Sequence, residues 1–466
     1  MKISIRLERK TLGAALSGAL LVLLAGVPAW AQSVNKGSAL DQALASVSEV
    51  SGIKLPDKNR VLVVERKRSI SDEHAIYKLG APWSPFQATG FVAEKGKPFT
   101  VYLIIDPDDV CPNLDIINLG KYNWDDQVGQ TLKPGKNEIT PTKSGIMYIA
   151  NPHQQKRPPV VYFADSPMMP LYRHGKTTRE EWKTMLKKEN PYGMVEIVTQ
   201  RTMFTLTAEK FKKTPPNIEK LCETLEEIMS VYARLLGLSE KNPPPNDIPQ
   251  NVMHIIEVDA GYMYATNCRI AFHRDVIHEI LDYQNNRKSG WGLWHEIGHM
   301  HQVQEYKFND MSEVTVNIFS LEAQAHFKNR ARIDSPEMRT AIQKHLALPR
   351  NKRDYHKIGD VFIKLAMFWQ LRLAFGEDFY PKLHRYNREH NPEQEDRQQY
   401  FIQLSSRISG YDLRPFFEAW GLSVSPQTED AISKLKLRKL TQQIWRNLNF
   451  SQVTSKGRVG VAPSKY

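Results

Sequence analysis

Cysteine is scarce in this chain of 466 residues, which contains only Cys111, Cys222 and Cys268. Three cysteines can form at most one disulfide bond, so the fold is not a disulfide scaffold. None of them has a CxxC partner, which disfavours a zinc site built from thiolates. Internal repeats and low-complexity segments are also lacking, and a composition with 41% hydrophobic and 24% charged residues is typical of globular proteins.

Long hydrophobic runs are missing beyond the first thirty residues, so no transmembrane span is expected in the mature chain. Residues 1–31 have the features of a signal peptide, because four basic residues precede an apolar run at 12–27 and an A-x-A site ends at Ala31. An uncleaved membrane anchor is the alternative, although the apolar run is shorter than the roughly 20 residues that span a bilayer. We expect export, cleavage after Ala31, and a periplasmic or secreted mature protein.

The excess of basic residues is modest once the leader is set aside. The formal charge of the chain is +12, and the leader carries +3 of it, which leaves +9. The remaining basic residues occur in short runs, such as 65–68 and 435–439, without the interleaved aromatic residues of a nucleic-acid-binding surface. We expect no nucleic-acid partner, while attraction to acidic glycans or anionic envelope surfaces is compatible with this charge.

The length predicts two or three domains, because single hydrophobic cores tend to stop growing at about 250 to 300 residues. Short β-prone runs separated by turn residues predict an antiparallel β-sandwich-like domain after an ambiguous N-terminal segment. Mixed strand and helix patterns and then mostly helical patterns follow. The expected fold class is therefore α+β. The expected bounds are 1–31 for the signal peptide, 32–75 for the N-terminal segment, 76–156 for the sandwich, 157–330 for a mixed α/β catalytic domain and 331–466 for a C-terminal helical lobe.

One short motif carries the chemistry. The stretch 290–306, GWGLWHEIGHMHQVQEY, lacks proline and is expected to form a partly buried helix. On it, His295 and His299 lie one turn apart on one face, close enough for both imidazoles to bind one zinc ion, although buried structural histidines are the alternative. Glu296 lies beside this face, where it can act as a general base toward water. Gly298 would let the helix approach a neighbouring element closely.

A zinc hydrolase needs a third protein ligand and one open position. The metzincin spacing would require glycine at 302 and histidine at 305, where this chain has Gln302 and Glu305, so that family is excluded. His301 lies about 200° round the helix from His299, so it points away from the metal and is expected to be exposed or packed.

A second helix is expected to begin near Asp310 to Ser312, because both residues are favourable N-caps. Its first carboxylate, Glu313, is separated from His299 by thirteen residues, which leaves room for a turn and a helix that returns antiparallel beside the first. We predict Glu313 as the third ligand, with Glu322, two turns deeper, as the alternative. An acidic residue at this position is also favoured simply by the helix macrodipole.

Supporting roles are predicted for two groups of polar residues. The segment 261–267, GYMYATN, offers Tyr262, Tyr264 and Asn267 beside an expected edge strand as donors to a developing oxyanion or as substrate contacts, although tyrosines beside a strand often serve packing. Asn317, on the second helix, is a candidate to orient a metal ligand or to serve as a plain core amide.

Several longer segments resemble one known family. GWGLWHEIGHMHQ followed by EVTVNIFSLEA resembles the HExxH motif and the EVTxN ligand helix of the enhancin-like, mucin-targeting zinc metallopeptidases. SPFQATGFVAEKGKPFTVYL, LKPGKNEIT and SGIMYIAN resemble strands of that family's β-domain, and PLYRHGKTTREEWKTML resembles the opening of its catalytic domain. The resemblance covers roughly residues 83–330.

This resemblance implies a gluzincin-type endopeptidase with one zinc ion per chain, held by His295, His299 and Glu313, with Glu296 as general base. It also implies protein substrates that are heavily O-glycosylated and mucin-like, although this chain lacks an obvious extra carbohydrate-binding module. A catalytically silent glycoprotein- or glycan-binding protein is the rival interpretation, and a structural envelope protein is a third. The base Glu296 argues against the rival, and the open coordination position argues against the third.

Overall fold

The computed structural model describes residues 36–118, 127–304, 306–308, 311–390 and 396–461. The expected signal peptide and its cleavage site lie outside these residues. Within the described part of the chain, no helix combines the length and the apolar character needed to cross a membrane. The three cysteines are free thiols. The bridge that the sequence permitted is therefore not formed.

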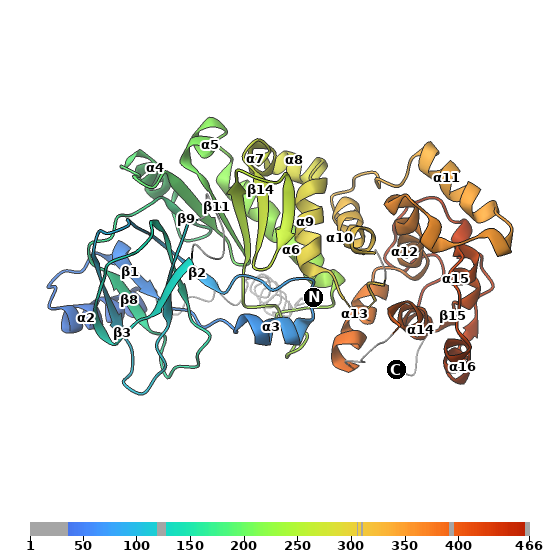
Figure 1. Ribbon diagram of the computed structural model, residues 1–466, viewed down its shortest axis with the longest axis horizontal. Helices are drawn as coiled ribbons and strands as arrows, with labels where there is room; N and C mark the ends of the chain where they lie inside the picture. Colours follow the sequence, from blue (N-terminus) through green and yellow to red (C-terminus); the bar gives the residue numbers. More distant parts are fainter. Residues whose placement is uncertain (1–35, 119–126, 305, 309–310, 391–395, 462–466) are drawn as a thin grey trace, which may run out of the picture.

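Two four-stranded antiparallel sheets form a sandwich in the N-terminal half (Figure 1). Burial alternates along β3 (Phe99–Ile104), whose Phe99, Val101 and Leu103 point into the core between the sheets. Phe91 and Phe163 come from opposite sheets and stack with ring centroids 4.4 Å apart. The first sheet has the order β1 (Val61–Val63), β8 (Val160–Phe163), β3, β6 (Gly135–Ile139), and the second β2 (Phe86–Ala93), β7 (Gly145–Ala150), β4 (Asn113–Ile117), β5 (Gln127–Thr131).

The sandwich extends beyond the range 76–156 that the sequence suggested. β1 precedes this range and β8 follows it, yet β8 pairs antiparallel with both β1 and β3. The strand at 160–163 therefore belongs to the sandwich and not to the mixed α/β domain. The helix α2 (Lys36–Ser51) packs against the same sheet, and α3 (Ile70–Tyr77) follows β1.

A mixed six-stranded sheet lies at the centre of the molecule (Figure 1). Its helix-covered face packs in the main core with α6 (Ile218–Leu235), and its other face packs against the second sheet of the sandwich. The hydroxyl of Tyr148 on β7 donates to the Glu196 carboxylate on β10 at 2.5 Å, across this second interface. The strand order is β13 (Met263–Thr266), β14 (Arg269–His273), β12 (Met253–Val258), β11 (Thr202–Thr207), β10 (Met194–Val198), β9 (Leu171–Arg173).

The smaller helices of this domain and those of the C-terminal lobe complete the α+β fold. The lobe has no separate core, since α12 (Val361–Phe375) is buried on nearly every side and shares the main core with α10. The domain helices are α4 (Arg179–Lys187), α5 (Ala208–Lys213), α7 (Ile277–Leu281), α8 (Tyr283–Lys288), α9 (Trp291–His301) and α10 (Ser312–His326). The lobe adds α11 (Pro336–Ala347), α13 (Phe379–His390), α14 (Arg397–Ser409), α15 (Arg414–Trp420), α16 (Pro426–Lys434) and the short strands β15 (Tyr411–Asp412) and β16 (Arg438–Lys439).

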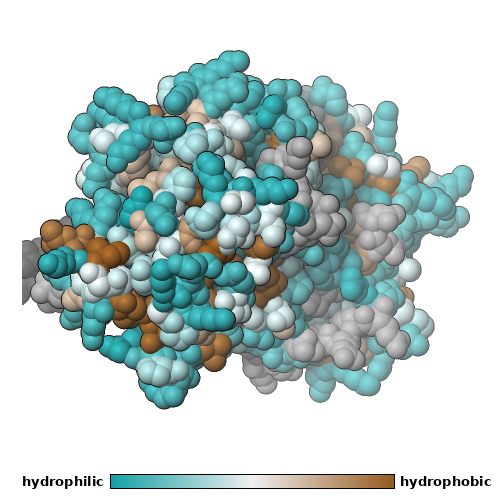
Figure 2. All heavy atoms as spheres, turned by 60° about the vertical axis from the view of Figure 1, so that its left-hand side comes forward, coloured by the Kyte–Doolittle hydropathy of each residue, from teal (hydrophilic) through white to brown (hydrophobic). Residues whose placement is uncertain are grey.

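The surface on the sandwich side is mostly hydrophilic, with apolar side chains in a few groups (Figure 2). Leu55 is the most exposed of the large apolar residues that the structure describes, at 92%. Scattered exposed apolar residues are ordinary on protein surfaces.

Candidate metal centre

The helix α9 presents both histidines of the HExxH motif to a cleft. Trp294, Ile297 and Met300 are fully buried and anchor the helix in the main core. His295 and His299 lie on the opposite, partly exposed side, with their Nε2 atoms 3.0 Å apart. The sequence predicted a helix over 290–306, but α9 ends at His301 because the Gln302 backbone leaves the helical region (ψ 138°).

The third group comes from the first turn of α10. The Glu313 carboxylate places one oxygen 3.1 Å from Nε2 of His295 and the other 3.5 Å from Nε2 of His299. Tetrahedral zinc with ligand distances of about 2.0 to 2.1 Å holds neighbouring ligand atoms about 3.3 Å apart, so this spacing fits such an ion. In the described residues, His295, His299 and Glu313 are the one group of three or more His, Cys, Asp or Glu side chains that could hold a metal ion.

Close packing of α9 on α10 brings the three groups together. A Cβ atom on Gly298 would lie 2.9 Å from Val316 Cγ2 and 3.1 Å from the Val316 carbonyl oxygen, so the approach depends on glycine, as its position in the motif suggested. Met311 is the N-cap residue of α10 and makes no side-chain cap bond. The helix therefore starts where the sequence indicated, but Ser312 is its first residue and not its cap, and Asp310, the other predicted cap, lies outside the described residues.

Hydrogen bonds to the outer ring nitrogens orient both histidines. Asn317 Oδ1 lies 2.9 Å from Nδ1 of His295, and Gln302 Oε1 lies 3.4 Å from Nδ1 of His299. Because an amide oxygen can only accept, each Nδ1 carries the proton and each Nε2 keeps its lone pair toward the cleft. Asn317 also donates to the Glu313 carbonyl at 2.8 Å.

Gln302 also lines the cleft, although the sequence indicated only that it does not fit the metzincin spacing. Its Nε2 donates to the Ser312 carbonyl at 2.7 Å and to the Thr315 hydroxyl at 2.5 Å, which ties the end of α9 to the start of α10. Its place three residues after His299 was the signal available in the sequence. Only the turn after α9 could show that the side chain comes back to the histidine.

Glu296 is 7% exposed and borders the same cleft. Burial raises the pKa of Glu296 to about 7, and the nearby Glu313 carboxylate adds to the rise, while a hydrogen bond from the Ala265 N–H opposes it. Since Ala265 lies on β13, the edge of this strand that β14 does not cover faces the base. A carboxyl group with this pKa can exchange protons near neutral pH.

The cleft has a volume of about 410 Å³ and joins α9, α10 and β13. Tyr264 lines it, whereas Tyr262 and Asn267, the other two predicted donors, are exposed and do not. The lining consists of Gly80, Ala81, Met263, Tyr264, Ala265, His295, Glu296, His299, Gln302, Gln304, Lys307, Ser312 and Glu313.

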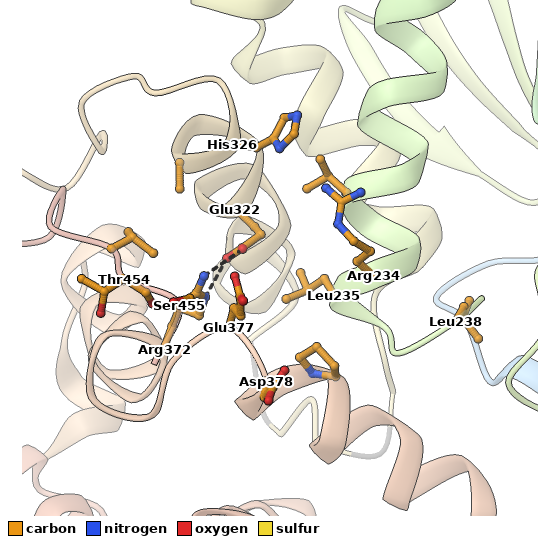
Figure 3. A pocket seen from close by; sticks show the side chains of 14 residues that line it. Arg234, Leu235, Leu238, Glu322, His326, Arg372, Glu377, Asp378, Thr454 and Ser455 are labelled. Atoms are coloured by element: carbon orange, nitrogen blue, oxygen red, sulfur yellow. Dashed lines mark hydrogen bonds and ion pairs between the residues drawn. The ribbon is translucent and has the colours of Figure 1, made fainter. Parts of the chain in front are cut away.

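His301 and Glu322 do not line the cleft. His301 is 1% exposed, its Nδ1 donates to the Ile297 carbonyl at 2.7 Å, and burial lowers its pKa to about 4, so it is a packing histidine. Glu322 accepts two hydrogen bonds from the Arg372 guanidinium, at 3.1 and 3.2 Å, in a separate cavity of about 580 Å³ between α6, α10 and the lobe (Figure 3). Glu305 lies outside the described residues.

The chain is 29% identical over 333 residues to TRPM8 channel-associated factor 1 of Bos taurus, an alignment that covers 66% of this chain and 34% of that protein. The chain thus spans about a third of the length of the curated relatives it matches.

Two solved structures share the fold. A functionally unknown conserved protein from Bacillus anthracis is 28% identical, with a TM-score of 0.77 over 84% of this chain and 82% of that one. The M60 catalytic domain of Clostridium perfringens ZmpC, solved with the sialyl T antigen, is 18% identical, with a TM-score of 0.69 over 83% of this chain and 81% of that one. The sequence pattern of the family "Peptidase M60, enhancin and enhancin-like" matches residues 167–421, more than half of the chain. This range contains α9, α10, the three candidate ligands and Glu296, and the chain belongs to that family.

Proposed function

We propose that this chain is an exported zinc endopeptidase that hydrolyses peptide bonds in O-glycosylated, mucin-like proteins. The proposal rests on two features that lie together. The ligand atoms of His295, His299 and Glu313 are spaced as a tetrahedral ion requires, and the buried Glu296 lies beside them. Family membership supports peptidase chemistry. The basic and apolar leader at 1–31 supports export, and the glycan bound to the ZmpC relative supports a glycosylated substrate.

The two histidines and Glu313 would hold the ion, with the Nδ1 bonds to Asn317 and Gln302 keeping each imidazole in place. A zinc ion bound there would supply Lewis acidity, which lowers the pKa of water and polarises a carbonyl group. Two histidines and one carboxylate leave a fourth position open for chemistry.

Glu296 acts as the general base in this proposal. Its pKa of about 7 lets the carboxylate accept a proton from the attacking water and return that proton to the leaving amine. The uncovered edge of β13 faces this carboxylate through Ala265, and an extended peptide can add to such an edge by main-chain hydrogen bonds. Tyr264 lines the cleft beside it and remains our candidate to contact the substrate or the oxyanion.

A binding protein without peptidase activity is the second candidate. The curated relatives are named for association with a channel and not for proteolysis, and this chain matches about a third of their length. The same fold can host binding or catalysis. The base Glu296 distinguishes the two, because binding alone does not require it.

The test compares the parent protein, Glu296→Gln and the surface control Glu138→Gln on mucin-type glycoproteins before and after deglycosylation, with cleavage sites identified by mass spectrometry. Glu296→Gln should keep zinc content and folding but lose at least about a hundredfold in turnover, and the control should match the parent. Cleavage at the parent rate by Glu296→Gln would remove this residue as the base. Zinc-loaded parent protein that binds O-glycosylated peptides but cleaves none of a broad panel would establish the binding function instead. Equal cleavage of deglycosylated substrate would remove the mucin preference.

A further inference from the structure

A further cavity lies between the sandwich and the central sheet, and it shares no lining residue with the metal centre. Its volume is about 680 Å³. Lys67 and Phe86 contribute from the sandwich side, Arg173 and Met203 from the central sheet, and Glu223 from α6. No residue of the proposed mechanism uses this space.

Besides the exposed Lys176, the cations Lys67 and Arg173 line this cavity, and neither forms an ion pair with any residue that the structure describes. Lys67 is 6% exposed, and its Nζ donates to the Phe86 carbonyl at 2.9 Å. Arg173 donates from Nη2 to the Ala88 carbonyl at 2.6 Å. Each cation thus caps one carbonyl on the outer edge of β2, which is the edge strand of its sheet. These single bonds leave two donors on the ammonium and four on the guanidinium.

The nearest carboxylates are engaged with other partners or lie too far away. Glu73 accepts from the backbone N–H groups of Gln250 and Asn251, and Glu196 accepts from Tyr148 and Thr205. Glu65 is exposed and, among the residues that the structure describes, forms no ion pair within 4.0 Å. Glu65 and Glu73 attract Lys67, and Glu65 and Glu196 attract Arg173, but among the described residues none of these carboxylates forms an ion pair with either cation. Burying cations without a direct ion pair is costly, so their remaining donors favour an incoming anion.

The other lining residues indicate which chemical groups a ligand would carry besides its anionic group. Phe86, Met203 and Val252 supply apolar surface, whereas Glu223 and Glu226 on α6 supply carboxylates. Glu223 pairs with Lys220 and Glu226 with Arg201, whereas an inorganic anion would leave the apolar surface without a partner. The walls suit a molecule with an anionic end, a carbon body and hydrogen-bond donors at the far end.

We infer that this cavity binds a small organic acid, whose carboxylate contacts Lys67 and Arg173 and whose hydroxyl or amino groups face the acidic wall on α6. The cation pair matches a carboxylate because Arg and Lys donors form charge-assisted hydrogen bonds to its two oxygens. Because residues of both the sandwich and the central sheet line the cavity, a bound ligand should also stabilise the interface between them.

Binding is tested by calorimetric titration of the full mature chain with D-glucuronate and L-glutamate, and with glucose and inorganic phosphate as comparisons, at constant ionic strength. At least one of the acids should bind and raise the melting temperature, and glucose should not. Lys67→Met should weaken that binding by about tenfold to a hundredfold, because it removes a charged hydrogen bond. Lys97→Met, at an exposed lysine paired with Glu94, is the matched control and should bind like the parent.

Arg173→Gln repeats the comparison if Lys67→Met does not fold, since it removes the second cation and keeps a polar side chain. Failure of both acids to bind the parent protein would overturn the inference. So would equal affinity of the folded cation variant and the parent, or phosphate binding as tight as that of the acids. None of these measurements depends on peptidase activity, so the inference stands or falls separately from the proposed function.

Discussion

Gly298→Ala is the most direct test of how the fold assembles the metal centre. The new Cβ would lie 2.9 Å from Val316 Cγ2, 3.1 Å from the Val316 carbonyl oxygen and 3.3 Å from Phe319 Cβ. Ordinary contacts between carbon atoms are about 3.5 to 4.0 Å, so α9 and α10 must separate by roughly half an ångström or more. The carbonyl belongs to the helix backbone and cannot move aside alone.

The magnitude follows from two opposing effects. Overpacking a well-packed core costs about 1 to 3 kcal/mol, and alanine in place of glycine within a helix gives back up to about 1 kcal/mol. We expect a net loss of about 1 to 2 kcal/mol in the free energy of unfolding. Glu313 lies one turn before Val316 on α10, so the same separation should move it from the histidines and weaken zinc binding by about tenfold, equivalent to about 1.4 kcal/mol.

The assay uses thermal unfolding of the metal-free protein, which isolates the packing effect, and zinc titration against a chromophoric chelator. Gly359→Ala is the matched control, because its Cβ would have no neighbour within 4 Å. Its melting temperature and zinc affinity should stay close to those of the parent. If Gly298→Ala also matches the parent in both measurements, the two helices are not held at the separation described above.

Three further predictions concern single side chains. Glu313→Ala should weaken zinc binding more than about a hundredfold, whereas Glu322→Ala should leave it nearly unchanged because Arg372 holds Glu322 in another cavity. Loss of zinc from the Glu322→Ala protein would instead identify Glu322 as the third ligand. Asn317→Ala should weaken zinc binding by about ten- to a hundredfold through loss of the bond to Nδ1 of the histidine, and parent-like affinity in the same chelator assay would refute that role. Burial lowers the pKa of Lys67 from 10.5 to about 8. Between these pH values the unfolded chain binds a proton on Lys67 that the folded chain does not, so the free energy of unfolding rises with pH. In urea unfolding, the parent should therefore gain up to about 3 kcal/mol relative to Lys67→Met over this window, and parallel pH curves would contradict the burial of an unpaired ammonium.

The sequence by itself determined the local geometry of the site. Spacing of four residues on a helix sets His295 and His299 on one face, whatever the rest of the fold does, because the helical repeat is 3.6 residues. The same repeat excluded His301, which the structure places in the core. The mostly apolar residues 361–375 likewise form one helix, α12, because Asp360 caps its start and Gly376 ends it.

Only the tertiary structure decided which distant segments meet. The pattern at 160–163 identifies a strand, but not its partners. β1 pairs through Val61 with Tyr162 and β3 through Val101 with Phe163, and no local signal specifies either pairing, which depends on how the buried faces fit. The return of Gln302 to His299 depends on where α9 ends, and the position of Ala265 against Glu296 depends on β13 being an edge strand. Periodicity fixes which side of an element is buried, whereas the contact between two elements depends on the shapes of both surfaces, and that information is not present in either segment alone.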